Sequence, residues 1–322
     1  REAAAAGDGP SRQRRRPRCG NSRVPEPRRC GYVALVGRPN TGKSTLLNYL
    51  VGQKVSITSR KPQTTRHQVL GIRSEARWQA IYVDTPGMHD DGRRAINRVM
   101  NRAARSLLGD VDVLVMVVDR LHWTADDDRV LALLRETSAP LLLAVNKIDL
   151  LADKRVLLPG LESLQRRADP AALVPVSALR RQNLEQLEGE IRARLPEREF
   201  FFPEDQVTDR SQRFLAAELV REKLTRQLGD ELPYATAVEL EAFEEEGGIV
   251  HIAALILVER RGQKRIVIGE GGSRLRAIGS EARKDLERML GRRVMLRLWV
   301  KVRAGWADDE RALKSLGYDE RD

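Results

Sequence analysis

The sequence predicts a doubly wound α/β domain with a mostly parallel sheet, followed by a smaller α+β domain. Short apolar runs alternate with helical stretches as far as Arg198, and a phosphate-binding motif lies between the first strand and the first helix. The alternation stops at Phe200-Phe201-Phe202-Pro203. Two domains also suit the length of 322 residues, because single cores rarely grow beyond about 250 residues.

The elements follow from this alternation. In the first domain we expect strands at 31–36, 66–72, 77–83, 111–118, 140–145 and 172–176, and helices at 43–51, 93–108, 124–137, 153–168 and 183–195. Several of these strands are continuous apolar runs, as in sheets covered on both faces. In the second domain we expect a helix at 210–228, strands at 234–243 and 249–259, a short helix, a glycine-rich loop, a helix at 273–290 and a strand at 293–302.

The predicted organisation is a disordered basic tail (1–29), a nucleotide-binding domain (30–198), a linker (199–207), a second domain (208–303) and a C-terminal tail (304–322). Much of the net charge of +11 is confined to two stretches. Residues 1–30 carry nine arginines against three acidic residues, and residues 260–303 carry fourteen Lys and Arg against four. The second stretch suggests RNA, DNA or a membrane surface as the partner.

Cysteine usage and hydropathy indicate the compartment. Cys19 and Cys30 are the only cysteines, so there is no disulfide framework and no zinc-ligand spacing. The longest apolar runs are too short to span a bilayer, and the arginine-rich N-terminus lacks the apolar segment of a secretory signal. We therefore expect a cytoplasmic protein.

The phosphate-binding loop is the stretch Gly37-Arg38-Pro39-Asn40-Thr41-Gly42-Lys43-Ser44, followed by Thr45. It matches G-x-x-x-x-G-K-[ST] and stands after an apolar strand and before a helix, as the P-loop mechanism requires. Successive N–H groups at the helix N-terminus point at the phosphates. Lys43 is expected to reach the β- and γ-phosphates, and the Ser44 hydroxyl is expected to bind Mg²⁺.

Two further stretches would complete the phosphate side. Asp84-Thr85-Pro86-Gly87 follows an apolar strand, so that Asp84 can hold the Mg²⁺ shell and the Gly87 N–H can meet the γ-phosphate. Gln63-Thr64-Thr65-Arg66 occupies the position of a loop that supplies a threonine to Mg²⁺. We prefer Thr65 to Thr64 for this role, and the predicted metal ligands are Ser44, Thr65 and Asp84.

The base is predicted from Asn146-Lys147-Ile148-Asp149, which ends another apolar strand. The Asp149 carboxylate can accept hydrogen bonds from guanine N1–H and the 2-amino group, and adenine offers no such pair of donors. Lys147 can pack its stem across the ring, and Asn146 can bond the base edge and nearby loops. Backbone amides at Ser177-Ala178 can contact the guanine oxygen.

These stretches predict a GTPase with GTP or GDP and Mg²⁺ as ligands, and Lys43, Thr65 and Gly87 as catalytic residues. Met88 stands where Ras-like proteins carry a glutamine that orients the attacking water, so we expect slow intrinsic hydrolysis. A partner or a monovalent cation would help. A K⁺ ion bound by the Asn40 carbonyl is our hypothesis for that cation.

The second domain contains Ile268-Gly269-Glu270-Gly271-Gly272 before the helix at 273–290, and this glycine loop resembles the KH loop that clamps single-stranded RNA. Basic side chains flank it, namely Lys264, Arg265, Arg274 and Arg276, and they would make phosphate contacts. Glu270 departs from the positive residues often found in such loops, and it is expected to weaken phosphate affinity.

Over residues 29–320 the chain resembles the Era-like family of P-loop GTPases with a C-terminal KH domain. The resemblance rests on the nucleotide motifs and on Lys61-Pro62-Gln63-Thr64-Thr65-Arg66-His67, Glu231-Leu232-Pro233-Tyr234, Gly262-Gln263-Lys264-Arg265 and Val302-Arg303-Ala304-Gly305-Trp306. It implies a type II KH fold and GTP hydrolysis coupled to binding the 3′ end of small-subunit (16S) rRNA during 30S assembly. It also implies loose peripheral association with the inner membrane, and a hydrophobic residue at Met88 is normal in this superfamily.

Other functions stay open. One is an RNA-binding GTPase with a different RNA target or a cell-cycle or membrane signalling role. A nucleotide-dependent RNA-modification protein would need a catalytic cysteine or a folate-type domain, and the sequence offers neither. A catalytically dead RNA-binding module is disfavoured by the complete set Lys43, Ser44, Asp84 and Asp149. We expect no DNA partner, and nothing in the sequence demands a dimer, so we expect a monomer.

Overall fold

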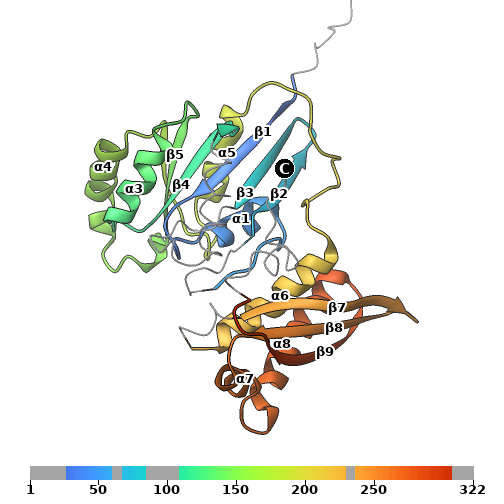
Figure 1. The fold of residues 1–322 in the computed structure, drawn as a ribbon. Coiled ribbons are helices and arrows are strands. Elements are labelled where there is room, and N and C mark those ends of the chain that lie inside the picture. Colours follow the sequence, from blue (N-terminus) through green and yellow to red (C-terminus); the bar gives the residue numbers. More distant parts are fainter. Residues whose placement is uncertain (1–26, 60–66, 85–108, 230–235, 307–322) are drawn as a thin grey trace, which may run out of the picture.

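The structure, a computed structural model, describes residues 27–59, 67–84, 109–229 and 236–306. These residues form a six-stranded sheet with its helices, followed by a three-stranded sheet with helices (Figure 1). The predicted fold class, a mostly parallel α/β domain followed by a small α+β domain, is thereby confirmed. The predicted helix at 93–108 lies outside the described residues, as does most of the predicted N-terminal tail.

The first sheet has the strand order β2-β3-β1-β4-β5-β6. Its strands are β1 (Arg29–Val36), β2 (Val69–Glu75), β3 (Trp78–Asp84), β4 (Val113–Asp119), β5 (Leu141–Asn146) and β6 (Ala172–Pro175). All pairs are parallel except β2 with β3. The antiparallel ladder continues to Glu75 opposite Trp78, which explains why β2 ends beyond the predicted 66–72. The carboxyl ends of the parallel strands lie at the same end of the sheet, which is where the ligand-binding loops of such sheets are found.

Helices cover both faces of this sheet, as the fully apolar strands require. On one face, α1 (Lys43–Val51) and α5 (Leu184–Arg194) pack on alternate strand residues such as Val33 and Leu35. On the other face, α3 (Ala125–Leu134) and α4 (Leu157–Ala168) pack on the intervening residues, among them Ala34 and Val36. α4 starts later than the predicted residue 153 because a 3₁₀ turn, Lys154–Val156, precedes it.

The segment Phe200–Phe202 packs on the first domain. Phe200 and Phe202 lie against the buried side chains of Cys30, Ile72 and Ile81. The fully buried Gln79 of β3 fixes the backbone here: its Oε1 accepts bonds from the Phe201 and Phe202 amides at 2.9 and 3.0 Å, and its Nε2 donates to the Phe202 carbonyl at 2.8 Å. Phe200 and Phe202 therefore cover part of one face of the first sheet, over β1, β2 and β3.

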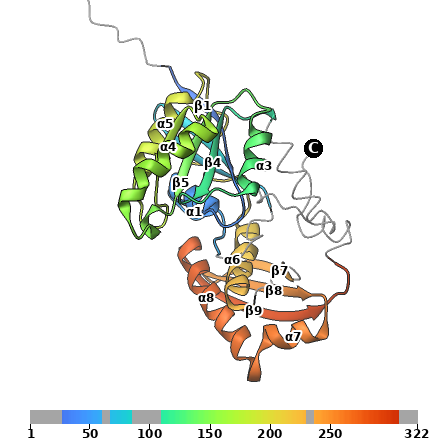
Figure 2. The ribbon, with the colours of Figure 1, turned by 90° about the vertical axis from the view of Figure 1, so that its left-hand side faces the viewer.

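The second domain has the element order α6 (Gln212–Gln227), β7 (Thr236–Glu246), β8 (Ile249–Val258), α7 (Arg261–Ile268), α8 (Ser273–Leu290) and β9 (Arg293–Val302). The central β8 pairs antiparallel with β7 and parallel with β9. α6 and α8 cover one face of this sheet through residues such as Leu219 and Leu286 (Figure 2). This helix–strand–strand–helix–helix–strand order is the one the sequence predicts.

The two domains meet at the loop that follows α1. Arg226 of α6 donates to the carbonyl and the hydroxyl of Thr58, both at 2.9 Å. The buried Glu222 accepts a bond from Thr58 at 3.2 Å and pairs with Lys54 and with Arg226. Residues 54–58 of the first domain are thus held by one face of α6.

We predict that Gln79→Leu lowers the free energy of unfolding by roughly 2 kcal/mol or more, because it strands three backbone groups of the Phe200–Phe202 segment. Urea unfolding followed by circular dichroism measures this loss. Gln165→Leu is the matched control, since Gln165 on α4 makes a single long bond of 3.4 Å to Pro170. Equal losses for the two variants would contradict the role given to Gln79.

Candidate functional site

The predicted phosphate loop connects β1 to α1 at the carboxyl edge of the sheet. Two glycines give it a path that no other residue fits: a Cβ on Gly37 would lie 2.4 Å from the Val117 carbonyl oxygen, and one on Gly42 would lie 2.3 Å from Asn146 Nδ2. Gly42 also has φ +100°. The loop itself consists of the remaining predicted residues Arg38, Pro39, Asn40 and Thr41. Lys43 begins α1, and Ser44 and Thr45 follow it in the first turn.

Lys43 is buried inside this loop. Its Nζ donates to the carbonyls of Gly37 and Arg38 at 2.8 and 3.0 Å. Burial lowers the pKa of Lys43 to about 8, against the opposing effect of the Asp84 carboxylate. The ammonium therefore rests on backbone oxygens at the place where a phosphate would give it a full counter-charge.

Ser44 and Asp84 meet at the end of β3. The Ser44 hydroxyl donates to Asp84 Oδ2 at 2.8 Å, and the Ser56 hydroxyl reaches the same oxygen at 2.8 Å. A serine hydroxyl and a buried carboxylate in contact are the oxygen donors that Mg²⁺ takes from proteins, so this pair fits the predicted metal. The other predicted residues of the phosphate side, Thr65, Thr85, Pro86 and Gly87, lie outside the described residues.

Asn146 joins three of the predicted loops. Its Nδ2 donates to the Thr41 carbonyl of the phosphate loop at 2.8 Å, while its Oδ1 accepts bonds from the amides of Lys147 at 2.8 Å and Ala178 at 3.0 Å. The side chain is almost fully buried. The structure therefore brings the phosphate loop and both predicted guanine stretches together around one carboxamide.

Lys147 and Asp149 take up fixed positions beside it. The Lys147 ammonium donates to the Asn40 carbonyl at 2.5 Å and to Asp119 Oδ2 at 2.8 Å. Burial by itself raises the pKa of Asp119. The hydrogen bonds from Lys147 and Arg120 have the larger combined effect and hold that pKa below its usual value. The Ser177 hydroxyl donates to Asp149 Oδ1 at 2.6 Å. The carboxylate at the predicted base position is thus oriented by a neighbouring predicted loop.

Sequence reasoning missed three contributors to this site. They are Asp119, Ser56 and Asp127. The fully buried carboxylate of Asp127 accepts a bond from Arg38 Nε at 3.1 Å. Asp119 had a usable signal, because it ends an apolar strand as Asp84 does. Ser56 lies in a loop with no distinctive pattern, whereas Asp127 is the N3 residue of the capping box that begins at Thr124, a pattern that marks a helix start and not a ligand site.

The glycine loop of the second domain lies between α7 and α8. Gly269, Gly271 and Gly272 all have positive φ, at 74°, 56° and 78°. Two predicted RNA-binding arginines bond backbone carbonyls of this unit: Arg274 donates to Ile266 of α7 at 2.5 Å, and Arg276 donates to Gly271 of the loop at 3.1 Å. Ile268 packs inward beside the fully buried Val267, and Lys264, Arg265 and Glu270 belong to α7 and the loop. All nine predicted RNA-binding residues therefore lie within one helix–loop–helix unit.

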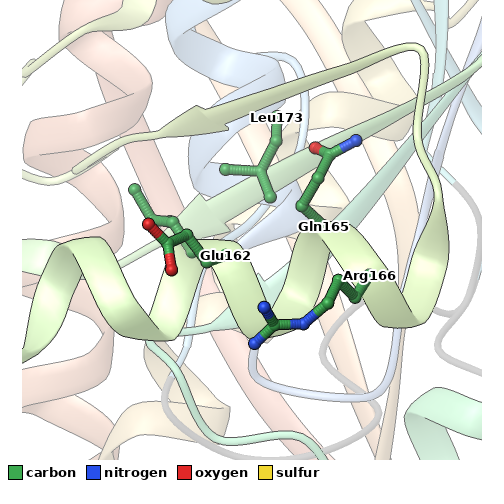
Figure 3. A pocket seen from close by; sticks show the side chains of 5 residues that line it. Glu162, Gln165, Arg166 and Leu173 are labelled. Atoms are coloured by element: carbon green, nitrogen blue, oxygen red, sulfur yellow. The ribbon is translucent and has the colours of Figure 1, made fainter.

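A surface hollow lies elsewhere, between α4 and β6 (Figure 3). It is lined by Leu161, Glu162, Gln165, Arg166 and Leu173. None of the predicted nucleotide or RNA residues lines it, so it does not compete with the site above. Among the described residues, no helix has the length and apolar character needed to cross a membrane.

Comparison with known proteins matches two family models to the two domains. Residues 32–147 match a family of 50S ribosome-binding GTPases, and residues 231–307 match the KH domain family. The chain is 63% identical over 292 residues to the GTPase Era of Marinobacter nauticus, covering 91% of this chain and 96% of that protein. It is 60% identical over 295 residues to the GTPase Era of Pseudomonas aeruginosa, covering 92% of this chain and 97% of that protein.

Two solved structures are similar over 90% of this chain and 99% of their own, each with a TM-score of 0.87. One is a substituted Era from Aquifex aeolicus bound to GDP and AlF4⁻, at 38% identity. The other is an Era in complex with MgGDPNP and nucleotides 1506–1542 of 16S ribosomal RNA, at 37% identity. The identity to the curated relatives and the coverage of nearly their whole length show that the chain belongs to the GTPase Era family.

Proposed function

We propose that this GTPase is a nucleotide-operated switch that binds the 3′ end of 16S rRNA through its KH domain and acts in assembly of the 30S subunit. The convergence of the phosphate loop and the guanine loops on Asn146 supports a GTP site in the first domain. The glycine loop and its basic flanks support an RNA site in the second. A related Era has been solved with MgGDPNP and a 16S rRNA fragment, which supports both ligands.

The nucleotide is bound, in this proposal, by the residues predicted from the motifs. On arrival of the phosphates, the Lys43 ammonium exchanges the Gly37 and Arg38 carbonyls for phosphate oxygens. Ser44 and Asp84 hold Mg²⁺, which would neutralise charge that develops on the phosphates. The backbone amides of the loop, pre-aimed at the helix N-terminus, supply donors that need no rearrangement at the moment of reaction.

Guanine is selected by Asp149, which Ser177 holds in place. The stem of Lys147 packs along the ring because its ammonium is fixed at both Asn40 and Asp119. The backbone carbonyl of Asn40 is engaged by Lys147, so the K⁺ hypothesis rests on the Asn40 side-chain carbonyl. Thr65 and Gly87 retain their predicted catalytic roles as part of this proposal.

The RNA is held at Lys264, Arg265, Ile268, Arg274 and Arg276 and the loop Gly269–Gly272, with phosphates approaching the glycine backbone. We further propose that the protein acts as a monomer in the cytoplasm, with peripheral association at the inner membrane. The single observation that carries the assignment is the junction at Asn146, because it unites the phosphate and guanine loops in one site.

Nucleotide affinity is predicted to fall with rising pH because of Lys43. The pKa of Lys43 is about 8 in the free protein and rises when phosphates pair with the ammonium, so binding takes up a proton above that pH. GDP affinity should drop by about fourfold between about pH 7 and about pH 8.5. Titration calorimetry in two buffers measures both affinity and proton uptake. Lys43→Arg stays charged and serves as the control; an equal drop in that variant would contradict the assignment.

Asp149→Asn should exchange the preferred base. The amide oxygen can still accept from N1–H, but its NH₂ group faces the 2-amino group of guanine and suits the 2-oxo group of xanthine. We expect GDP affinity to fall by about a hundredfold or more and xanthosine diphosphate affinity to rise. Competition against a fluorescent nucleotide measures both. Asp153→Asn, a change at a half-exposed aspartate four residues further along, should leave the preference unchanged. An unchanged preference in Asp149→Asn would remove that residue from the base site.

The switch itself is tested with an oligonucleotide from the 3′ end of 16S rRNA. We expect tight, sequence-selective binding with a non-hydrolysable GTP analogue and weaker binding with GDP, at one fixed salt concentration. A scrambled oligonucleotide is the control. Equal binding in both nucleotide states, with the scrambled control bound as well, would refute the proposed switch and its target.

A further inference from the structure

The edge strand β9 presents two different faces. Val294, Leu296, Leu298 and Val300 pack into the apolar clusters formed with α6, α7 and α8. The alternate residues Arg293, Met295, Arg297, Trp299 and Lys301 are all exposed, with 43% of Met295 and 38% of Trp299 open to solvent. Since successive strand residues point to opposite sides, this second row lies on the sheet face turned away from the helices and the glycine loop.

The three cations of this row form no ion pair with any residue in the described part of the chain. The neighbouring Arg292, by contrast, pairs with Glu245. Across the same face, the row borders residues of β8, of which Leu255 and Leu257 are buried: Ile249, His251, Ala253, Leu255 and Leu257. Beyond them lie Glu239, Glu244 and Glu246 of β7. The face is therefore basic at the β9 edge, largely apolar in the middle and acidic at the far edge.

A row in which cations alternate with an exposed tryptophan and a methionine suits single-stranded nucleic acid. Bases stack on aromatic rings whatever their sequence, while Lys and Arg contact the backbone phosphates. Alternate residues of a strand stand roughly 6.7 Å apart, so the row is an extended track rather than a single contact point. Charges on an edge strand also deter unwanted strand pairing, but that purpose does not call for an exposed Trp299.

We propose that the exposed row of β9 is a second contact for single-stranded RNA, behind the glycine-loop site and continuous with it around the edge of the sheet. The inference rests on the proposed RNA-binding function and extends its footprint. Arg293, Arg297 and Lys301 contact phosphates, and Trp299 stacks on a base. The acidic side chains of β7 repel the backbone and confine the RNA to the β9 side.

A second copy of the chain is the competing occupant, because basic and acidic edges on one face can pair with each other across a two-fold axis. RNA is favoured by what lies on the other side of β9. There α7 and α8 contact β9 and carry the basic residues Lys264, Arg265 and Arg276, so both sides of the strand are basic. The acidic edge is two strands away. RNA, a polyanion, needs only this basic surface, whereas a second copy of the chain would have to match the basic and the acidic edge together.

Tryptophan fluorescence of the full chain tests the stacking contact. Trp78 and Trp306 are buried, and Trp123 lies in the first domain, so quenching by RNA reports on Trp299. The probe is the 16S rRNA 3′-end oligonucleotide, used full length and shortened, with the GTP analogue present. We expect the full-length probe to quench the wild type and not Trp299→Leu, and affinity to fall about tenfold in that variant. Trp123→Leu should bind the probe like the wild type.

Salt dependence tests the phosphate contacts. The triple variant Arg293→Ala, Arg297→Ala and Lys301→Ala should make the decline of log affinity with log salt less steep by about 2. Each lost phosphate contact on single-stranded RNA accounts for roughly 0.7 of that change. Intrinsic GTP hydrolysis and the circular dichroism spectrum should be unchanged in these variants. Gly271→Asp serves as the glycine-loop comparison, and the shortened probe should be less sensitive to the β9 variants than the full-length one.

The outcomes separate the two proposals. If Gly271→Asp abolishes RNA binding while the β9 variants keep wild-type affinity, slope and quenching, the β9 contact is refuted and the proposed function stands. If the wild type binds no RNA, both fail. A molar mass that doubles with protein concentration and returns to the monomer value in Trp299→Leu, without RNA quenching, would assign the face to a second copy and overturn the inference.

Discussion

The hydrogen bonds of Asn146 are the constraint on which the nucleotide site depends. One buried carboxamide donates to the phosphate loop at Thr41 and accepts from the backbone at Lys147 and Ala178. Its partners come from segments that follow three different strands, so the distance between the phosphate and base positions is set by one side chain. Gly42 completes the arrangement, because any Cβ there would collide with Asn146 Nδ2. The three hydrogen bonds of this buried group hold it in one geometry, since a buried polar group that loses its partner costs about 1–3 kcal/mol.

The nucleotide site and the second domain share a short segment of chain. Ser56 donates to Asp84, and two residues later Thr58 is held by Arg226 and Glu222 of α6. Asp84 is one of the proposed metal ligands, and its bonding partner Ser56 lies only two residues from Thr58 at the domain interface. Such a shared segment is a physical route by which nucleotide state and RNA affinity can be linked, because both then bias the same local structure.

Most of the fold is predictable from the sequence, and the reason is local. Apolar runs such as Val113–Val118 and the turns after them specify strands and loops without knowledge of distant residues. Lys43, Asp84, Asn146 and Ser177 come together because the loops at the carboxyl ends of parallel strands lie at the same end of the sheet. Other contacts join residues that are 28 to 123 positions apart in the sequence. They are those of Gln79 with the Phe200–Phe202 segment, of Arg38 with Asp127 and of Ser56 with Asp84. No local pattern encodes such pairs or tells which side chains of β7 and β8 lie beside the exposed row of β9.

The packing of Phe200 and Phe202 on Cys30, Ile72 and Ile81 has a practical consequence for dividing the chain. The alternation of strands and helices stops at Phe200, so the sequence alone suggests dividing the chain immediately after the last helix of the first domain. A fragment cut there would lose the cover of three buried side chains and the bonding partners of Gln79. It would expose an apolar patch on the face of the sheet, and such patches promote aggregation. The bonds of Ile72 N to the Val207 carbonyl and of Leu70 N to Asp209 extend the same attachment. The natural unit for separate expression of the GTPase half therefore reaches at least to Asp209.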